Sequence, residues 1–358
     1  MVKSGLSVRF VPLLAAVLGI PCLALRVATA QTEFSVTAAD LAWDAVKFLG
    51  HPQPSIVGAG SVAPRLTPVQ QAAKSADEAN RLRAFQTQYP THPAVREAKR
   101  LEALALNHGA LMGDATQEAR RTLLVTELRA DEAIPVVARF EVVAWSLQVE
   151  NMRRAHPTKA IRLAAHEAVA NSLIAEFPTV ADGYASLFAV GLQSASDRAG
   201  AIARQLINIP ATPEVVKAEA RRLVERLALI GKPIDELFAN NGGTSLRFAK
   251  ESGPTIIYSW TAGAAPSIAL AKRMKQSFPH AEFVGVCLDP DTVNAQRVAS
   301  ASGIPGRQYF DARGVGSPLA AALAMGTPAV VLLADKAGVI RDVQGVQQTK
   351  AKLSSFAQ

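Results

Sequence analysis

Residues 254–288 read PTIIYSWTAGAAPSIALAKRMKQSFPHAEFVGVCL, and this stretch decides the fold of the C-terminal part of the chain. The β-branched and aromatic run at 255–259 predicts a strand. Residues 265–278 carry apolar side chains at helical spacing and predict a helix, whereas the apolar run at 282–288 predicts a second, buried strand. Strand and helix signals that alternate in this way indicate a layered α/β structure with helices packed on a central sheet.

The alternation continues to the end of the chain. A turn at 335–338, with the sequence DKAG, separates the last two strand-like runs. The predicted elements are a helix at 293–301, a strand at 308–310, a helix at 318–325, strands at 329–333 and 339–343, and a final helix at 347–356.

The preceding part, residues 67–230, is rich in Ala, Leu and Arg, and its apolar residues recur at helical spacing. Thr67 followed by Pro68 is typical of a helix start. Aromatic or apolar residues followed by proline at 89–90, 177–178 and 209–210 predict helix ends. Further helix starts are predicted at Asp114, Asp131, Thr158, Thr179 and Thr212. Such a series indicates stacked antiparallel helical hairpins.

The first thirty residues have the pattern of a signal peptide. Lys3 and Arg9 precede an apolar stretch at 11–25, and the small residues of the Ala28-Thr29-Ala30 sequence then predict cleavage before Gln31. A membrane anchor is the alternative, but the stretch is shorter than the roughly 18–20 residues that span a bilayer. A lipid anchor at Cys22 is the other alternative. We therefore expect an exported protein, periplasmic or otherwise extracytoplasmic.

Charge and cysteine content limit the possible functions. Loss of Lys3, Arg9 and Arg26 with the leader would lower the formal net charge from +8 to +5, a small excess for a chain of this length. Basic residues are not gathered with aromatic ones, so nucleic acid is not an expected partner. Only Cys287 would remain, so no internal disulfide can form, and its position in an apolar strand predicts an inert buried thiol.

Four segments carry a family resemblance, of which FVGVCLDPD (283–291) resembles a core strand. TIIYSWTAGAAPS (255–267) resembles the strand, active-site turn and helix start of the thioredoxin-like TlpA and AhpC/TSA (redoxin) family, usually written F-W-A-T-W-C-x-P-C. Trp260 then matches the first Trp and Pro266 the Pro between the two cysteines, while Gly263 replaces the second Trp. GTPAVVLLADKAGVI (326–340) resembles the cis-proline segment, with Thr327 and Pro328 as its Thr-Pro pair. Residues 230–248 resemble the entry segment, which forms a short β-hairpin.

The resemblance covers residues 230–356 and implies a thioredoxin-like fold with a cis peptide bond before Pro328, packed opposite Ala264 and Ser267. Those two residues stand where the family has its redox cysteines. Thiol–disulfide exchange requires an attacking thiolate and a second, resolving thiol. Neither a methyl group nor a hydroxyl can supply these, so the site is degenerate and no catalytic residue is predicted.

The predicted architecture is therefore an α+β two-domain chain. It comprises a signal peptide (1–30), an N-terminal segment and linker (31–66), an all-α helical domain (67–230) and a thioredoxin-like domain (231–358). No cofactor is expected. No metal site is expected either: His166-Glu167 begins a zinc-binding H-E-x-x-H motif, but Ala170 occupies the position of the second histidine.

Three functions remain open at this point. The first is a redox-inactive fold that binds a protein or peptide partner in a groove formed by Trp260, Pro266, Thr327 and Pro328, although Trp260 can equally be a core residue. The second is an oxidoreductase or antioxidant enzyme that uses Cys287 between molecules. The third is an interaction module centred on the helical half. Enzymatic activity is not expected, because the catalytic cysteines are replaced.

Overall fold

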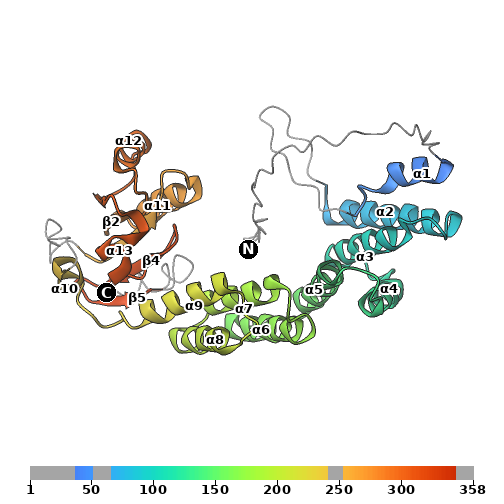
Figure 1. Cartoon of the computed structure of the whole chain (residues 1–358), viewed down its shortest axis with the longest axis horizontal. Helices are drawn as coiled ribbons and strands as arrows, with labels where there is room; N and C mark the ends of the chain where they lie inside the picture. The colour runs from blue at the N-terminus through green and yellow to red at the C-terminus, as the bar shows by residue number, and fades with distance from the viewer. Residues whose placement is uncertain (1–36, 51–65, 241–252, 344–358) are drawn as a thin grey trace, which may run out of the picture.

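The computed structural model describes residues 37–50, 66–240 and 253–343. The protein is an α+β structure that is mostly helical, with a five-stranded mixed sheet in its C-terminal part (Figure 1). The helices before the sheet are α1 (Ala38–Val46), α2 (Pro68–Gln88), α3 (Val95–Leu111), α4 (Glu118–Ala130), α5 (Val136–Arg153), α6 (Lys159–Glu176), α7 (Ala181–Gln193), α8 (Ser196–Asn208), α9 (Glu214–Leu227) and α10 (Ile234–Asn240). The later elements are β1 (Thr255–Trp260), α11 (Ala265–Ser277), β2 (Glu282–Cys287), α12 (Thr292–Ser302), β3 (Arg307–Tyr309), the 3-10 helix η1 (Gly314–Gly316), α13 (Pro318–Ala322), β4 (Val331–Ala334) and β5 (Ile340–Asp342).

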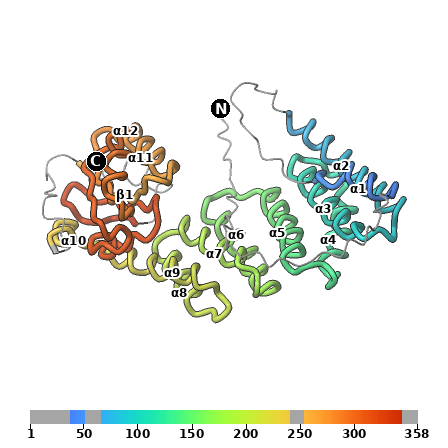
Figure 2. Tube along the Cα trace, turned by 45° about the horizontal axis from the view of Figure 1, so that its top comes forward, coloured from blue at the N-terminus to red at the C-terminus, as the bar shows by residue number. Residues whose placement is uncertain are grey.

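Helices α2 to α9 form a curved row in which each helix packs against the next one along the chain (Figures 1 and 2). The proline-based predictions of helix ends are confirmed. Helices α2, α6 and α8 stop at the residues before Tyr89-Pro90, Phe177-Pro178 and Ile209-Pro210. Proline disfavours helical backbone in the residue that precedes it, so each of these pairs ends a helix.

The predicted helix starts are confirmed in part. Thr67 and Thr158 are N-caps whose hydroxyls accept hydrogen bonds from the backbone N–H groups of Gln70 and Ile161. Asp131 is instead the C-cap of α4, because Pro135 delays the next helix until Val136. The prediction at Asp114 is also wrong, since α4 begins four residues later. The segment interpreted as a linker contains α1, which Thr37 caps through a capping box with Asp40.

The sheet has the strand order β3-β2-β1-β4-β5. Strands β1, β2 and β3 are parallel, whereas β4 pairs antiparallel with β1 and β5 antiparallel with β4. The alternation of strands and helices predicted after residue 254 is therefore confirmed through β5. The predicted helix at 347–356 and the leader at 1–30 lie outside the described residues.

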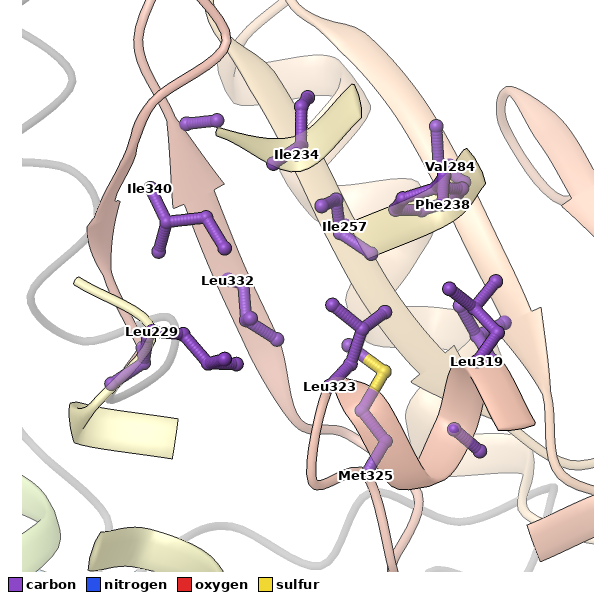
Figure 3. Close-up of a cluster of buried hydrophobic side chains, with 14 of the residues drawn as sticks. Leu229, Ile234, Phe238, Ile257, Val284, Leu319, Leu323, Met325, Leu332 and Ile340 are labelled. Atoms are coloured by element: carbon purple, nitrogen blue, oxygen red, sulfur yellow. The ribbon is translucent and has the colours of Figure 1, made fainter. Parts of the chain in front are cut away.

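Side chains alternate between the two faces of the sheet and form two separate cores. One face carries Ile256, Tyr258, Trp260 and Cys287, which pack with residues of α11 and α12. The other face is shown in Figure 3, where Ile257, Val284 and Leu332 of the strands face α10 and α13. Both faces are therefore covered by helices, as in layered α/β structures.

The connection between α9 and α10 belongs to the sheet core. Leu229 and Ile234 are buried in the core cluster of Figure 3. The backbone of the connection also pairs with the β5 hairpin: Gly231 N–H donates to the Ile340 carbonyl (2.8 Å), and Ile340 N–H donates to the Lys232 carbonyl (3.0 Å).

The β-hairpin expected in the entry segment is not found in its described part, since residues 234–240 form helix α10. Ile234 and Phe238 are both buried, whereas Glu236 between them is exposed. In a strand all three side chains would share one face, so this burial pattern fits a helix. Residues 241–252 lie outside the described part.

Candidate binding edge of the sheet

Strand directions bring the residues singled out in the sequence to one edge of the sheet. The parallel strands β1 and β2 end at this edge, and the antiparallel strand β4 begins there. The loops 261–264 and 288–291 therefore leave the sheet close to the loop 327–330 that enters β4. We call these three loops the binding edge; ligands of open α/β sheets bind at the carboxyl ends of parallel strands.

Ser259 fastens two of the loops together. Its hydroxyl donates to the Thr327 carbonyl (2.7 Å) and accepts from the Val330 N–H (3.0 Å). The backbone of Ser259 adds two bonds: its N–H donates to the Val330 carbonyl, and its carbonyl accepts from the Ala329 N–H, both at 2.9 Å. Because Ser259 is fully buried, these four bonds hold the loop before β4 firmly against the end of β1.

The turn 261–264 is held by a carboxylate from the neighbouring strand. Asp289, which follows β2, accepts a hydrogen bond from the Ala262 N–H at 2.5 Å. Within the turn, Ala264 N–H donates to the Thr261 carbonyl (3.2 Å). Gly263 at the tip is exposed, and a Cβ added there would have no atom within 4 Å. Asp291 in the same loop caps α12 by accepting a hydrogen bond from the Asn294 N–H.

The two positions that match the family's cysteines hold no reactive group. Ala264 is partly exposed. Ser267 is 2% exposed, and its hydroxyl donates to the Ala264 carbonyl at 2.7 Å. Cys287 is fully buried, and burial raises the pKa of its thiol to about 11. A thiol protected from water and protonated at neutral pH is a poor nucleophile.

Trp260 does not form a wall of the groove, and that interpretation is wrong. Its side chain is completely buried and meets Phe310 edge to face, with 6.1 Å between ring centroids. In a strand, alternate side chains share a face, so Trp260 follows Ile256 and Tyr258 into the core beneath α11 and α12. The alternative interpretation, that Trp260 is a core residue, is the one that its burial supports.

The expected cis peptide bond before Pro328 is also not found, because no described residue has a cis peptide bond. The chain turns into β4 by another route: Ala329 has a φ of 71°, in the left-handed region. A trans X–Pro bond is the more stable isomer by roughly 0.5–1 kcal/mol, and the left-handed residue after it supplies the change of direction.

The loops 261–264 and 327–330 of the binding edge have small, uncharged side chains at their tips, whereas the loop 288–291 carries Asp289 and the exposed Asp291. The exposed residues of the turn, the first helical turn of α11 and the loop before β4 are Gly263, Ala265, Pro266, Thr327, Pro328 and Ala329. Pro266, Thr327 and Pro328 are thus the predicted site residues that the structure leaves accessible. Neither Ser259 nor the role of Asp289 was predicted from the sequence. The signal that could have identified Ser259 is a serine within an otherwise apolar strand.

Tyr258 is buried in β1. Its hydroxyl donates to the Pro305 carbonyl (2.7 Å) and lies 3.0 Å from Gln308 Nε2, and burial raises its pKa. Gly285 on β2 leaves room for this pair, since a Cβ there would lie 2.0 Å from Gln308 Oε1. The arrangement links β1 to the loop before β3 and offers no proton for chemistry at neutral pH.

The described part of the chain contains no group of three or more His, Cys, Asp and Glu side chains placed to hold a metal ion. Among the same residues, every helix is too short or too polar to span a bilayer.

Comparison with protein-family models gives no match, and comparisons with curated proteins and with solved structures give none either.

Proposed function

We propose that this chain is an exported, redox-inactive protein with a thioredoxin-like C-terminal fold, which holds an extended peptide or partner segment at the binding edge. The strand order and strand directions support the fold proposal, since β1, α11, β2, β4 and β5 occupy the places that the sequence resemblance assigns to them. The trans bond before Pro328 and the helix at 234–240 are departures from that family.

The observation that carries the binding proposal is the combination of a rigid frame with accessible, uncharged side chains at the tips of the loops 261–264 and 327–330. Buried hydrogen bonds of Ser259 and Asp289 fix the loops 261–264 and 327–330, while the side chains at their tips remain exposed. A preorganised surface loses little conformational entropy when it binds. Thr327, the residue before the proline, uses one lone pair of its carbonyl for Ser259, which leaves the second lone pair for a partner's N–H.

The oxidoreductase alternative is weakened by the position of Cys287. An intermolecular disulfide requires a thiol that a partner can reach, and Cys287 lies in the sheet core beneath α11 and α12. The surviving hydroxyl at Ser267 donates to the Ala264 carbonyl, and among the described residues it makes no hydrogen bond to a side chain that could act as a base. Binding without chemistry is therefore the better-supported function of this edge.

The experiment tests the binding edge with a charge placed at its tip. A peptide library is selected on purified wild-type protein, and the enriched peptides are then measured on two variants. Gly263→Arg adds a long cation where a Cβ meets no atom, so the fold should be retained. Ala301→Arg adds the same charge at the exposed C-terminal end of α12, near the opposite edge of the sheet.

We expect Gly263→Arg to weaken binding about tenfold or more, the effect of losing roughly 1.4 kcal/mol of contact energy. Ala301→Arg should bind as the wild type does. If the peptides bind both variants equally, the binding site lies elsewhere. If binding is lost only when helices α2–α9 are removed, the helical part is the one that binds. A selection that enriches no peptide would contradict the proposal.

A further inference from the structure

A cavity lies in the helical part of the chain, between α5 and α6. The last turns of α5 and the middle of α6 border this cavity, which has a volume of about 240 Å³ and opens to solvent. Its lining residues are Leu147, Glu150, Asn151, Arg154, Ala165, Ala168, Val169 and Ser172. The cavity therefore combines apolar walls with one cation, one anion and one amide.

Arg154 has no ion-pair partner among the described residues. It is exposed at the C-cap of α5. The neighbouring Arg153 differs, since it pairs with Glu118 at 2.7 Å. An unpaired guanidinium beside an apolar wall suits a carboxylate, which it can bind through two parallel hydrogen bonds.

Glu150 supplies the opposite charge. It stands four residues before Arg154, a spacing at which such residues commonly pair on a helix, yet among the described residues no ion pair joins the two. Within the described part of the chain its one ion-pair contact is with Arg121, at a long 3.4 Å, and its side chain is 43% exposed. The carboxylate thus retains lone pairs for a second cation.

Asn151 adds a buried acceptor. The residue is 2% exposed and lines the cavity, and its Nδ2 lies 3.1 Å from His166 Nδ1. Its Oδ1 has no hydrogen-bond partner in the described part. Buried polar atoms are rarely left unpaired in folded proteins, so an unpaired amide oxygen beside a cavity suggests that a ligand donor belongs there.

We propose that this cavity binds a free α-amino acid with a small apolar side chain. The ligand's carboxylate binds Arg154, its ammonium group binds Glu150 and the Asn151 amide oxygen, and its side chain lies against Leu147 and Val169. The volume favours this size, because it is smaller than the roughly 300–1,000 Å³ of sites for drug-sized ligands. The proposal does not depend on the binding edge of the sheet.

Three probes separate the contributions of the two charges. Leucine carries both the carboxylate and the ammonium group, leucinamide lacks the carboxylate, and N-acetylleucine lacks the ammonium group. Each is titrated into the purified full chain by calorimetry at concentrations up to about 10 mM, which detects dissociation constants in the millimolar range. We expect leucine to bind most tightly and the two analogues to bind about tenfold more weakly, as each loses a charge-assisted hydrogen bond.

Two variants and a control assign the contacts. Arg154→Ala should weaken leucine binding about tenfold and should abolish the difference between leucine and leucinamide, since both changes remove the same contact. Ala168→Trp fills the cavity from an exposed helix position and should abolish binding without a change of charge. Arg162→Ala removes an exposed cation that does not line the cavity and should leave binding within about twofold of wild type.

Several outcomes overturn the proposal. They are no binding of leucine to the wild type, equal binding of leucine and leucinamide, equal binding of leucine and N-acetylleucine, or equal weakening by Arg154→Ala and Arg162→Ala. Thermal unfolding of each variant shows that the fold is retained, and Ala168→Trp provides the test if Arg154→Ala is unstable.

Discussion

Single residues decide whether the end of β1 is a reactive site or a binding surface. Ala264 and Ser267 could be recognised from the sequence as replacements for a cysteine pair, because a methyl and a hydroxyl cannot exchange disulfides. The burial of Trp260 could not be recognised with equal certainty. A tryptophan at a strand end suits both a core and a surface, and the strand's register decides which face it joins.

Cys287 gives a prediction about pH. The pKa of its thiol is raised by burial from 9.0 to about 11, so the unfolded chain loses this proton at lower pH than the native one. Its contribution to stability is complete below pH 9.0 and is lost as pH rises to about 11. We expect this loss to be on the order of 2–3 kcal/mol, at about 1.36 kcal/mol per pKa unit.

The measurement compares the free energy of urea unfolding from pH 8 to pH 11 for wild type and Cys287→Ala. Other groups titrate in both proteins, so the difference between the two curves isolates the thiol. The variant should be less stable at pH 8 because a buried side chain is truncated, and its stability should fall less steeply. Parallel curves, or rapid reaction of the native thiol with an aromatic disulfide at neutral pH, would show that Cys287 is accessible.

At the scale of helices and strands, local signals predict the ends marked by proline and the alternation after residue 254. They fail where a tertiary contact or a second local signal decides which element forms or where it begins. Asp131 has the residue type of an N-cap but ends α4, because Pro135 fixes the next helix start. Residues 234–240 form α10, in which Ile234 and Phe238 face the core cluster while Glu236 between them is exposed.

Arg226 of helix α9 contacts the segment between α13 and β4, and this contact gives a testable prediction. Arg226 is 3% exposed, and its Nη1 donates to the Ala324 carbonyl at 2.8 Å. Burial lowers its pKa, which shows that the charge is poorly solvated. We expect Arg226→Ala to cost about 2–3 kcal/mol through the cavity and the unpaired carbonyl that it leaves.

Arg226→Met should cost less than Arg226→Ala, because it keeps most of the buried volume and removes the desolvated charge. Chemical unfolding of the three proteins gives the order. Equal losses for both variants would mean that the hydrogen bond to Ala324, rather than packing, holds α9 against this segment. Lys217→Ala, at a half-buried position near the start of the same helix and away from Ala324, serves as the control.

At the scale of the whole molecule, the helical row and the sheet meet through α9 and the connection 228–233 (Figures 1 and 2). The sequence predicts both parts from their different periodicities, but it does not predict how they join. Arg226 lies in a run of alternating charges that is typical of a solvated helix face. Its burial and its hydrogen bond to the Ala324 carbonyl are seen only in the folded structure. Ala324 lies three residues before Thr327 of the binding edge.

The central claim is that the loops 261–264 and 327–330 bind a partner segment without changing it chemically. The most direct measurement is an amide chemical-shift titration of the full chain with a peptide enriched in the library selection. We expect the perturbed amides to cluster in residues 261–268 and 327–331, with the peptide recovered unmodified under reducing and oxidising conditions. Perturbations centred on α2–α8, or a peptide recovered with altered thiols, would contradict this account.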